Sequence, residues 1–255
     1  MIRKILKFLG NSKGENSQGD ALPALTDSDC LRCALKFIVN ECIYGDYYEF
    51  GVFRGQTLIS AFHGLKSTVS NRIKAQETIG SNKSAELLRK QILDETIFHA
   101  FDSFRGLPRL ESEDLYSNDF AEGQFTSTIQ ELMNLAINYN MPINRLKIYE
   151  GWFQESCIRF LQENPTPRKA SIIWLDCDLY SSARDCFPLI SELLQDGTVL
   201  IIDDWFSNKG SPFHGVQKAF YEWIVTKQIH DKFVLTEYKR ESWKRISFII
   251  NKKPK

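Results

Sequence analysis

The sequence predicts an α/β protein in which one mostly parallel sheet carries helices on both faces. Short apolar runs alternate along the chain with segments of helical periodicity, which is typical of parallel strands joined by helical crossovers. The chain has 255 residues, a size that a single domain can reach, and it is 43% hydrophobic and 25% charged, as globular proteins are. Two further apolar runs around a polar turn predict a hairpin-like pair of strands at the end.

The elements are expected in a regular order. Residues 1–25 are polar, with two glycines and a proline, and predict a flexible leader before a single domain over 26–255. Expected strands cover 47–52, 97–101, 146–149, 171–175 and 198–202, followed by the pair 232–237 and 245–250. Expected helices cover 26–42, 56–65, 83–94, 126–139, 183–194 and 216–226. The polar stretch 67–95 is expected to be an insertion.

Candidate N-caps begin two of these helices. Thr26, Asp27 or Ser28 is expected to cap the first helix, and Thr126 or Ser127 the helix that reaches about residue 139.

Composition and charge exclude several classes of protein. Lys and Arg number 32 and Asp and Glu also 32, so there is no basic excess for binding nucleic acid. No apolar run is long enough to predict a transmembrane helix, and the basic, apolar first ten residues are too short for a signal peptide. Six cysteines are too few for a disulfide scaffold, so we expect a reducing, cytoplasmic compartment.

A glycine-containing turn follows the first expected strand. Glu49, Gly51 and Gly55 form an E-x-G-x-x-x-G pattern, which lets the backbone turn sharply and brings a helix N-terminus near a ligand. The pattern also suits a tight strand–helix connection without a ligand. It is not the G-x-G-x-x-G of dinucleotide-binding proteins. Asp102, which follows the second strand, could accept both hydroxyls of a ribose or serve as an ordinary loop aspartate.

Four aspartates follow the fourth and fifth expected strands: Asp176, Asp178, Asp203 and Asp204. Carboxylates that close repel one another unless protons or a cation compensate them, and carboxylate oxygens suit Mg²⁺ or a similar divalent ion. The alternative is that these aspartates cap helices and pair with Arg184 or Lys209. His214 lies in a later loop that could overhang the site, where it could act on the substrate.

Five segments together carry a family resemblance: Y-E-F-G-V-F-R-G (48–55), F-D-S-F-R-G-L-P (101–108), G-W-F (151–153), L-D-C-D-L-Y (175–180) and I-D-D-W-F (202–206). They resemble the macrocin O-methyltransferase (TylF-like) family. The resemblance implies a Rossmann-like class I methyltransferase fold, with a seven-stranded sheet whose last strand is antiparallel, and S-adenosylmethionine (SAM) as cofactor. It implies that the cofactor is bound by Glu49, Gly51, Val52, Gly55, Thr57, Asp102, Ser103, Gly151, Trp152 and Asp176. It implies that the metal is bound by Asp176, Asp203 and Asp204.

The expected reaction is methyl transfer from SAM to a hydroxyl of a sugar or glycosylated small molecule with vicinal hydroxyls, assisted by Mg²⁺. Asp176 or Asp178 is expected to take the proton, with His214 as a further catalytic candidate. Two alternatives stay open, a nicotinamide-dependent oxidoreductase and a catalytically silent SAM-binding partner protein. The loop 103–125 suits either a lid or the contact of a homodimer.

Overall fold

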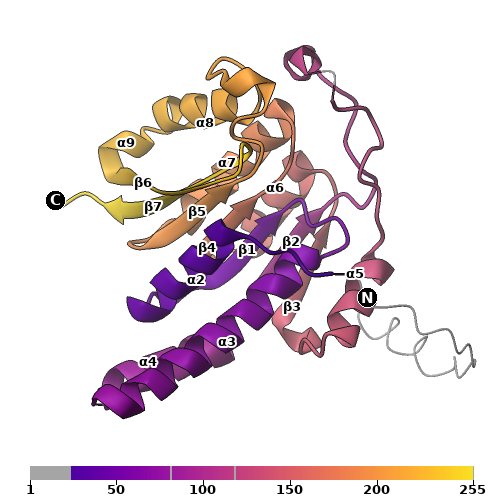
Figure 1. Cartoon of the computed structure of the whole chain (residues 1–255). Helices are drawn as coiled ribbons and strands as arrows, with labels where there is room; N and C mark the ends of the chain where they lie inside the picture. Colours follow the sequence, from indigo (N-terminus) through magenta and orange to yellow (C-terminus); the bar gives the residue numbers. More distant parts are fainter. Residues whose placement is uncertain (1–23, 81, 118, 255) are drawn as a thin grey trace, which may run out of the picture.

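Seven strands form one sheet in the order β3-β2-β1-β4-β5-β7-β6 in a computed structural model that describes residues 24–80, 82–117 and 119–254 (Figure 1). The strands are β1 (Asp46–Phe50), β2 (Phe98–Asp102), β3 (Leu146–Glu150), β4 (Ala170–Leu175), β5 (Thr198–Ile202), β6 (Phe233–Glu241) and β7 (Arg245–Lys252). The first five strands are parallel, and β7 is antiparallel to both of its neighbours, β5 and β6. The mostly parallel seven-stranded sheet with an antiparallel last strand is therefore confirmed.

Helices cover both faces of the sheet (Figure 1). They are α2 (Asp29–Asn40), α3 (Gln56–Ile79), α4 (Lys83–Glu95), α5 (Ile129–Asn138), α6 (Phe153–Glu163), α7 (Tyr180–Leu193), α8 (Gly215–Thr226) and the short α9 (Ile229–Lys232). Side chains of β4 alternate between two cores: Ile173 packs with residues of α6, α7 and α8, and Ile172 with residues of α2, α3 and α5. Strands buried on both faces read as continuous apolar runs, which is why the sequence located them well.

Two helices differ from expectation. The helix expected to end near residue 65 continues to Ile79, because no glycine or proline interrupts it after Gly64 until Gly80. α4 then turns back, and the buried Arg89 donates hydrogen bonds to the carbonyl oxygen of Val39 and to Gln76. The stretch 67–95 is therefore mostly helical. α6 was not anticipated, because its N-cap, Trp152, is not a usual capping residue and its buried residues are only Ser156, Cys157 and Phe160.

The N-caps match the sequence at one helix and differ at the other. The Ser28 hydroxyl accepts a hydrogen bond from the backbone N–H of Leu31, as expected for the start of α2. At α5 the cap is Thr128, and Ser127 instead donates to the carbonyl oxygen of Phe53. Ser127 thus ties the start of α5 to the turn after β1.

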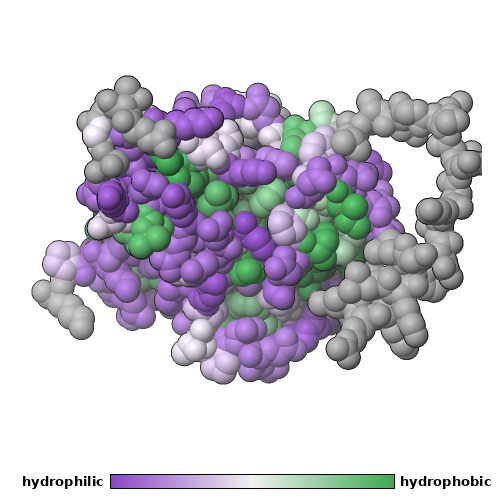
Figure 2. Space-filling model, turned by 90° about the horizontal axis from the view of Figure 1, so that it is seen from below, coloured by the Kyte–Doolittle hydropathy of each residue, from purple (hydrophilic) through white to green (hydrophobic). Residues whose placement is uncertain are grey.

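The surface seen from below is largely hydrophilic, and its apolar side chains lie in separate groups among polar ones (Figure 2). Across the described ranges, no helix combines the length and the apolar character that crossing a bilayer requires. The expected leader, residues 1–25, lies outside the described residues except for Ala24 and Leu25.

The sheet has its switch point between β1 and β4. From β1 the chain proceeds to β2 and β3 on one side, and from β4 to β5 on the other. Ligands of open α/β sheets bind at the carboxyl ends of the strands beside such a point. A ligand is therefore expected beside the residues that follow β1, β4 and β5.

Candidate functional site

The turn after β1 depends on a glycine. Gly51 has φ +84°, and a Cβ built there would lie 1.7 Å from the backbone oxygen of Asp176. Gly51 thus allows the carboxyl ends of β1 and β4 to meet. Gly55, with φ +93°, has a different role, because a Cβ there would lie 2.3 Å from Cδ1 of Leu132 in α5. Gly55 faces the side chain of Leu132, and it is not among the residues that line the two cavities described below.

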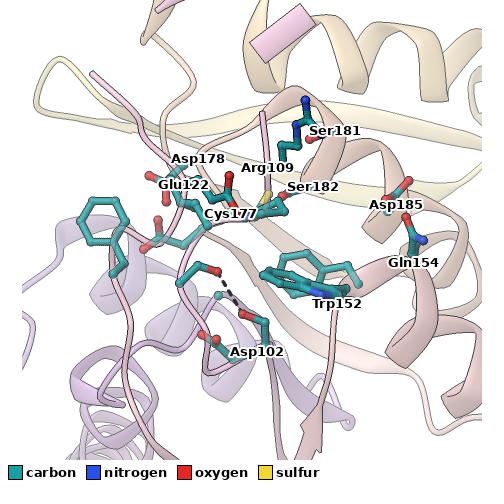
Figure 3. Close-up of a pocket in the computed structure, with 18 of the residues that line it drawn as sticks. Asp102, Arg109, Glu122, Trp152, Gln154, Cys177, Asp178, Ser181, Ser182 and Asp185 are labelled. Atoms are coloured by element: carbon teal, nitrogen blue, oxygen red, sulfur yellow. Dashed lines mark hydrogen bonds between the residues drawn. The ribbon is translucent and has the colours of Figure 1, made fainter. Parts of the chain in front are cut away.

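Two cavities lie at this end of the sheet, of about 580 Å³ and about 260 Å³. The residues Gly51, Phe53 and Asp176 line both of them. In the larger cavity, Asp102 and Trp152 lie on one side and Asp178 and Cys177 on the other (Figure 3). The two cavities therefore meet where β1 approaches β4.

Most of the expected site residues line these cavities. The larger one is lined, among others, by Gly51, Asp102, Ser103, Gly151, Trp152, Asp176 and Asp178. The smaller one is lined, among others, by Glu49, Gly51, Val52, Thr57 and Asp176. Four expected residues do not border these two cavities: Gly55, Asp203, Asp204 and His214.

Asp102 is held by the backbone of two loops. Its Oδ2 accepts hydrogen bonds from the N–H groups of Val52 at 2.8 Å and Phe53 at 2.9 Å, and its Oδ1 accepts from Phe104 at 2.7 Å. Burial raises the pKa of Asp102, although these backbone donors act in the opposite direction. A carboxylate has about four acceptor positions, so Asp102 retains capacity for a ligand hydroxyl.

Glu49 and Thr57 mark the smaller cavity. Glu49 is buried at the end of β1, where its Oε2 accepts a hydrogen bond from the Tyr47 hydroxyl at 2.5 Å. Burial, together with the charges of Asp176 and Asp102, raises the pKa of Glu49 well above its ordinary value. The Thr57 hydroxyl lies 2.9 Å from that of Thr26, whose segment borders the cavity.

Three carboxylates come together beside the larger cavity. One oxygen from each of Asp176, Asp178 and Asp204 lies within 4.8 Å of the others. Asp178 and Asp204 have φ of +62° and +56°, a sparsely populated backbone conformation that is often found at functional sites. Oδ2 of Asp204 is buried and has no hydrogen-bond partner within the described part of the chain. We call these three residues the acidic cluster.

The carboxylates of the acidic cluster are like charges that lie close together and repel one another. Burial is the largest cause that raises the pKa of Asp176 well above its ordinary value, and the charges of Asp203 and Asp204 raise it further. The pKa of Asp178 is also raised well above its ordinary value, chiefly by burial and further by the charges of Asp176 and Asp204. Carboxyl groups with raised pKa values accept protons or cations readily, so the donor set and the unpartnered oxygen of Asp204 fit a hard divalent cation.

Asp203 is not part of the acidic cluster, contrary to expectation. Its Oδ2 lies 2.8 Å from the guanidinium of Arg245, which belongs to β7, and its Oδ1 accepts from the N–H of Asp204. β7 runs antiparallel to β5, so the start of β7 lies beside the end of β5. The acidic cluster contains Asp178, which was not among the expected metal ligands, and the expected ligand Asp203 pairs with Arg245. The alternative partners do not pair with these aspartates either: Arg184 pairs with Glu111 and Asp185, and Lys209 lies over Tyr116.

His214 lies away from the two cavities. Its ring stacks on that of Tyr116, with 3.6 Å between centroids, and it stands at the N-cap position of α8. It therefore contacts neither Asp102 nor the acidic cluster in this arrangement. The expected contact of His214 with the site is therefore not seen, because His214 is not among the residues that line the larger cavity.

Replacing His214 by alanine is expected to change turnover by less than about threefold, because the side chain packs on Tyr116 and does not line the cavity. Steady-state kinetics would check this, with Tyr116→Leu as a matched variant that removes the same stacking. A loss of two or more orders of magnitude for the histidine variant alone would show that His214 reaches the substrate.

Sequence reasoning missed some residues of the site. Lys244, from the turn between β6 and β7, lines the larger cavity, and Ala24 and Thr26 line the smaller one. The antiparallel last strand was a signal for Lys244, because it brings the hairpin turn to the end of β5. Thr26 carried no such signal, since only the folded chain places it over the turn after β1.

Comparisons with known proteins show the family and the fold of the chain. The model of the macrocin O-methyltransferase (TylF) family matches residues 84–245. The chain is similar to the calicheamicin methyltransferase CalS11, with a TM-score of 0.62 and 17% identity over 97% of this chain and 90% of that one. It is similar to the O-methyltransferase NovP, with a TM-score of 0.56 and 17% identity over 86% and 77% of the chains. The SAH-bound methyltransferase PaMTH1 of Podospora anserina has a TM-score of 0.51 and 11% identity over 90% and 80%. No curated protein matches the chain.

Proposed function

The chain belongs to the macrocin O-methyltransferase family and is a SAM-dependent O-methyltransferase, and from this premise we propose that it methylates a sugar hydroxyl with the help of a divalent cation. The observation that carries the proposal is the acidic cluster, which stands beside the cavity that begins at the glycine turn. The sugar is suggested by a structural neighbour, since CalS11 is described as a TDP-rhamnose 3'-O-methyltransferase.

The two joined cavities supply a place for the cofactor. We assign its adenosine part to the larger cavity, where Asp102 would hold the ribose hydroxyls and Ser103, Gly151 and Trp152 would flank the adenine. We assign the methionine part to the smaller cavity, beside Glu49 and Thr57. Both cavities border Gly51 and Asp176, which supports one elongated ligand that occupies both.

The acidic cluster would hold the cation. A divalent ion bound there supplies orientation of vicinal oxygens and a lower pKa for the acceptor hydroxyl. Asp178 belongs to the acidic cluster, so its carboxylate would lie beside an acceptor hydroxyl held by the cation and could accept its proton, with Asp176 as a second candidate.

The transfer itself is an in-line displacement. The acceptor oxygen forms a bond to the methyl carbon, the carbon–sulfur bond breaks, and its electron pair stays on sulfur. The reacting atoms must approach to about 3 Å in line, so the residues contribute mainly position and charge.

A mass-shift assay with SAM and a panel of glycosylated small molecules and nucleotide sugars would test the proposal. We expect one methyl group per acceptor, transferred in the presence of Mg²⁺ and lost when EDTA is added. Undiminished transfer in EDTA would refute the role of the cation. Transfer to non-sugar diols, with none to any glycosylated compound, would refute the substrate class.

Asp102→Asn is expected to weaken SAM binding by about tenfold or more, because a charged hydrogen-bond acceptor is lost and the amide cannot replace all the contacts of the carboxylate. Calorimetry with SAM would measure this effect. Because burial raises the pKa of Asp102, lowering the pH protonates this acceptor earlier than in a free aspartate. SAM affinity of the unmodified protein should therefore fall as the pH is lowered, beginning at a higher pH than the titration of a free aspartate would give, and less steeply in the variant.

The same pKa shift has the opposite effect on stability. The folded carboxyl binds its proton more tightly than the unfolded one, so its contribution to the free energy of unfolding is present at low pH and lost as the pH rises. A pH dependence of SAM affinity that is identical in the unmodified protein and in Asp102→Asn would contradict the role of Asp102.

A further inference from the structure

A lysine reaches the acidic cluster from the cavity side. Lys244 lies in the turn between β6 and β7, which the antiparallel pairing of β5 and β7 brings to the end of β5. Its Nζ lies 3.3 Å from Oδ1 of Asp204 and 3.5 Å from Oδ2 of Asp203. Lys244 also lines the larger cavity. An ammonium group therefore stands against a carboxylate of the proposed cation site.

Lys244 is held less firmly than its neighbour Arg245. The guanidinium of Arg245 is bonded to Asp203, pairs with Glu241 at 3.3 Å and lies 4.7 Å from the ring centroid of Trp174. Its side chain is 16% exposed, whereas that of Lys244 is 33% exposed. Arg245 is thus fixed on three sides, while Lys244 faces the cavity and has access to solvent.

The charges explain why the lysine is there. Asp176, Asp178, Asp203 and Asp204 place four carboxylates in a small volume, and Lys244 and Arg245 are the basic residues paired with them among the described residues. Burial alone would lower the pKa of Lys244, but the carboxylates of Asp204 and Asp203 outweigh it and raise the pKa. Even so, Oδ2 of Asp204 has no partner among the described residues, so Lys244 satisfies only part of the need for positive charge.

We propose that the ammonium group of Lys244 is an internal counter-ion that leaves the acidic cluster when the divalent cation binds. The inference rests on the proposed cation site. A divalent ion and an ammonium group on the same Asp204 carboxylate repel each other. The flexible side chain of Lys244 lets its ammonium group move away while the ion stays bound. Asp203 keeps Arg245 as its partner when the lysine withdraws. Lys244 therefore lowers the affinity for the cation while it stabilises the cation-free protein.

Calorimetric titration with Mn²⁺ tests this exchange without reference to turnover. We expect Lys244→Met to bind Mn²⁺ more tightly than the unmodified protein, by about tenfold or more, because no ammonium group has to be displaced. Lys227→Met is the matched control, since it removes the same charge at an exposed position after α8 and should bind Mn²⁺ like the unmodified protein. Equal affinity in Lys244→Met and the unmodified protein, or weaker binding in Lys244→Met, would overturn the exchange and leave the cation site standing. No Mn²⁺ binding by either protein would overturn both the site and the exchange.

A second measurement uses the unmodified protein, so it does not depend on the folding of a variant. Reductive methylation followed by mass spectrometry reports how available each lysine amine is. We expect the labelling of Lys244 to increase several-fold, roughly, when Mn²⁺ is added, because the amine is released from Asp203 and Asp204, while the labelling of Lys227 stays constant. Unchanged or reduced labelling of Lys244 under conditions where calorimetry shows bound Mn²⁺ would overturn the proposal.

Discussion

Asp204→Asn is expected to lower methyl transfer by at least about 1000-fold, because Asp204 offers the acidic cluster a buried oxygen that no described residue satisfies. The amide keeps the shape of the side chain but carries no charge, so the cation should bind far more weakly. SAM affinity, measured without Mg²⁺, should stay within about threefold, since Asp204 lines neither of the two cavities assigned to the cofactor. Steady-state kinetics with Mg²⁺ and calorimetry with SAM would measure the two effects separately.

Stability supplies an internal check on this variant. Removing one of several like charges relieves repulsion, so the melting temperature should stay the same or rise. Asp185→Asn is the matched control, because Asp185 lines the larger cavity, beside which the acidic cluster lies, but pairs with Arg184 outside that cluster. If Asp204→Asn retained a tenth or more of the activity, roughly, the cation would not be bound through Asp204.

Gly51→Ala is expected to lower the free energy of unfolding by at least about 3 kcal/mol. The added Cβ would lie 1.7 Å from the backbone oxygen of Asp176, and the residue would keep a φ of +84° that alanine tolerates poorly. The ends of β1 and β4 must then separate, which disturbs the junction of both cavities. Urea unfolding would measure the loss of stability, and we expect SAM binding to be lost with it.

Gly123→Ala separates the two causes. Gly123 has φ +80°, nearly the same as Gly51, but a Cβ there meets nothing within 4 Å in the described structure. We therefore expect a loss of only about 1 kcal/mol in this control, from the backbone conformation alone. Equal losses in both variants would mean that the close approach to Asp176 relaxes at little cost.

The sheet could be predicted from the sequence because its signal is local. Strands such as β4 and β5 are buried on both faces and read as short apolar runs, so the strand ends were found within one or two residues. The helix α6 was not predicted, because its buried residues are few and include a serine and a cysteine. The full length of α3 was not predicted, because the polar residues of its second half suggested an insertion. A helix can nevertheless continue with only a narrow apolar stripe.

The candidate site could be predicted only in part. Sequence order placed Asp176, Asp178, Asp203 and Asp204 near one another, because they follow neighbouring strands. Which of them face one another depends on the turns, where Asp178 and Asp204 adopt positive φ, and on partners from a distant part of the chain. Arg245 removes Asp203 from the acidic cluster, and its position follows from the pairing of β7, which no local pattern specifies.

Asp176 borders both cavities assigned to the cofactor and also belongs to the acidic cluster, and this double position has a thermodynamic consequence. Two ligands that contact one side chain cannot bind independently if either changes its charge or position. Whatever factor the divalent ion applies to the affinity for SAM, SAM must apply to the affinity for the ion, because linkage is reciprocal. Binding constants of this protein therefore have meaning only when the concentration of the other ligand is stated.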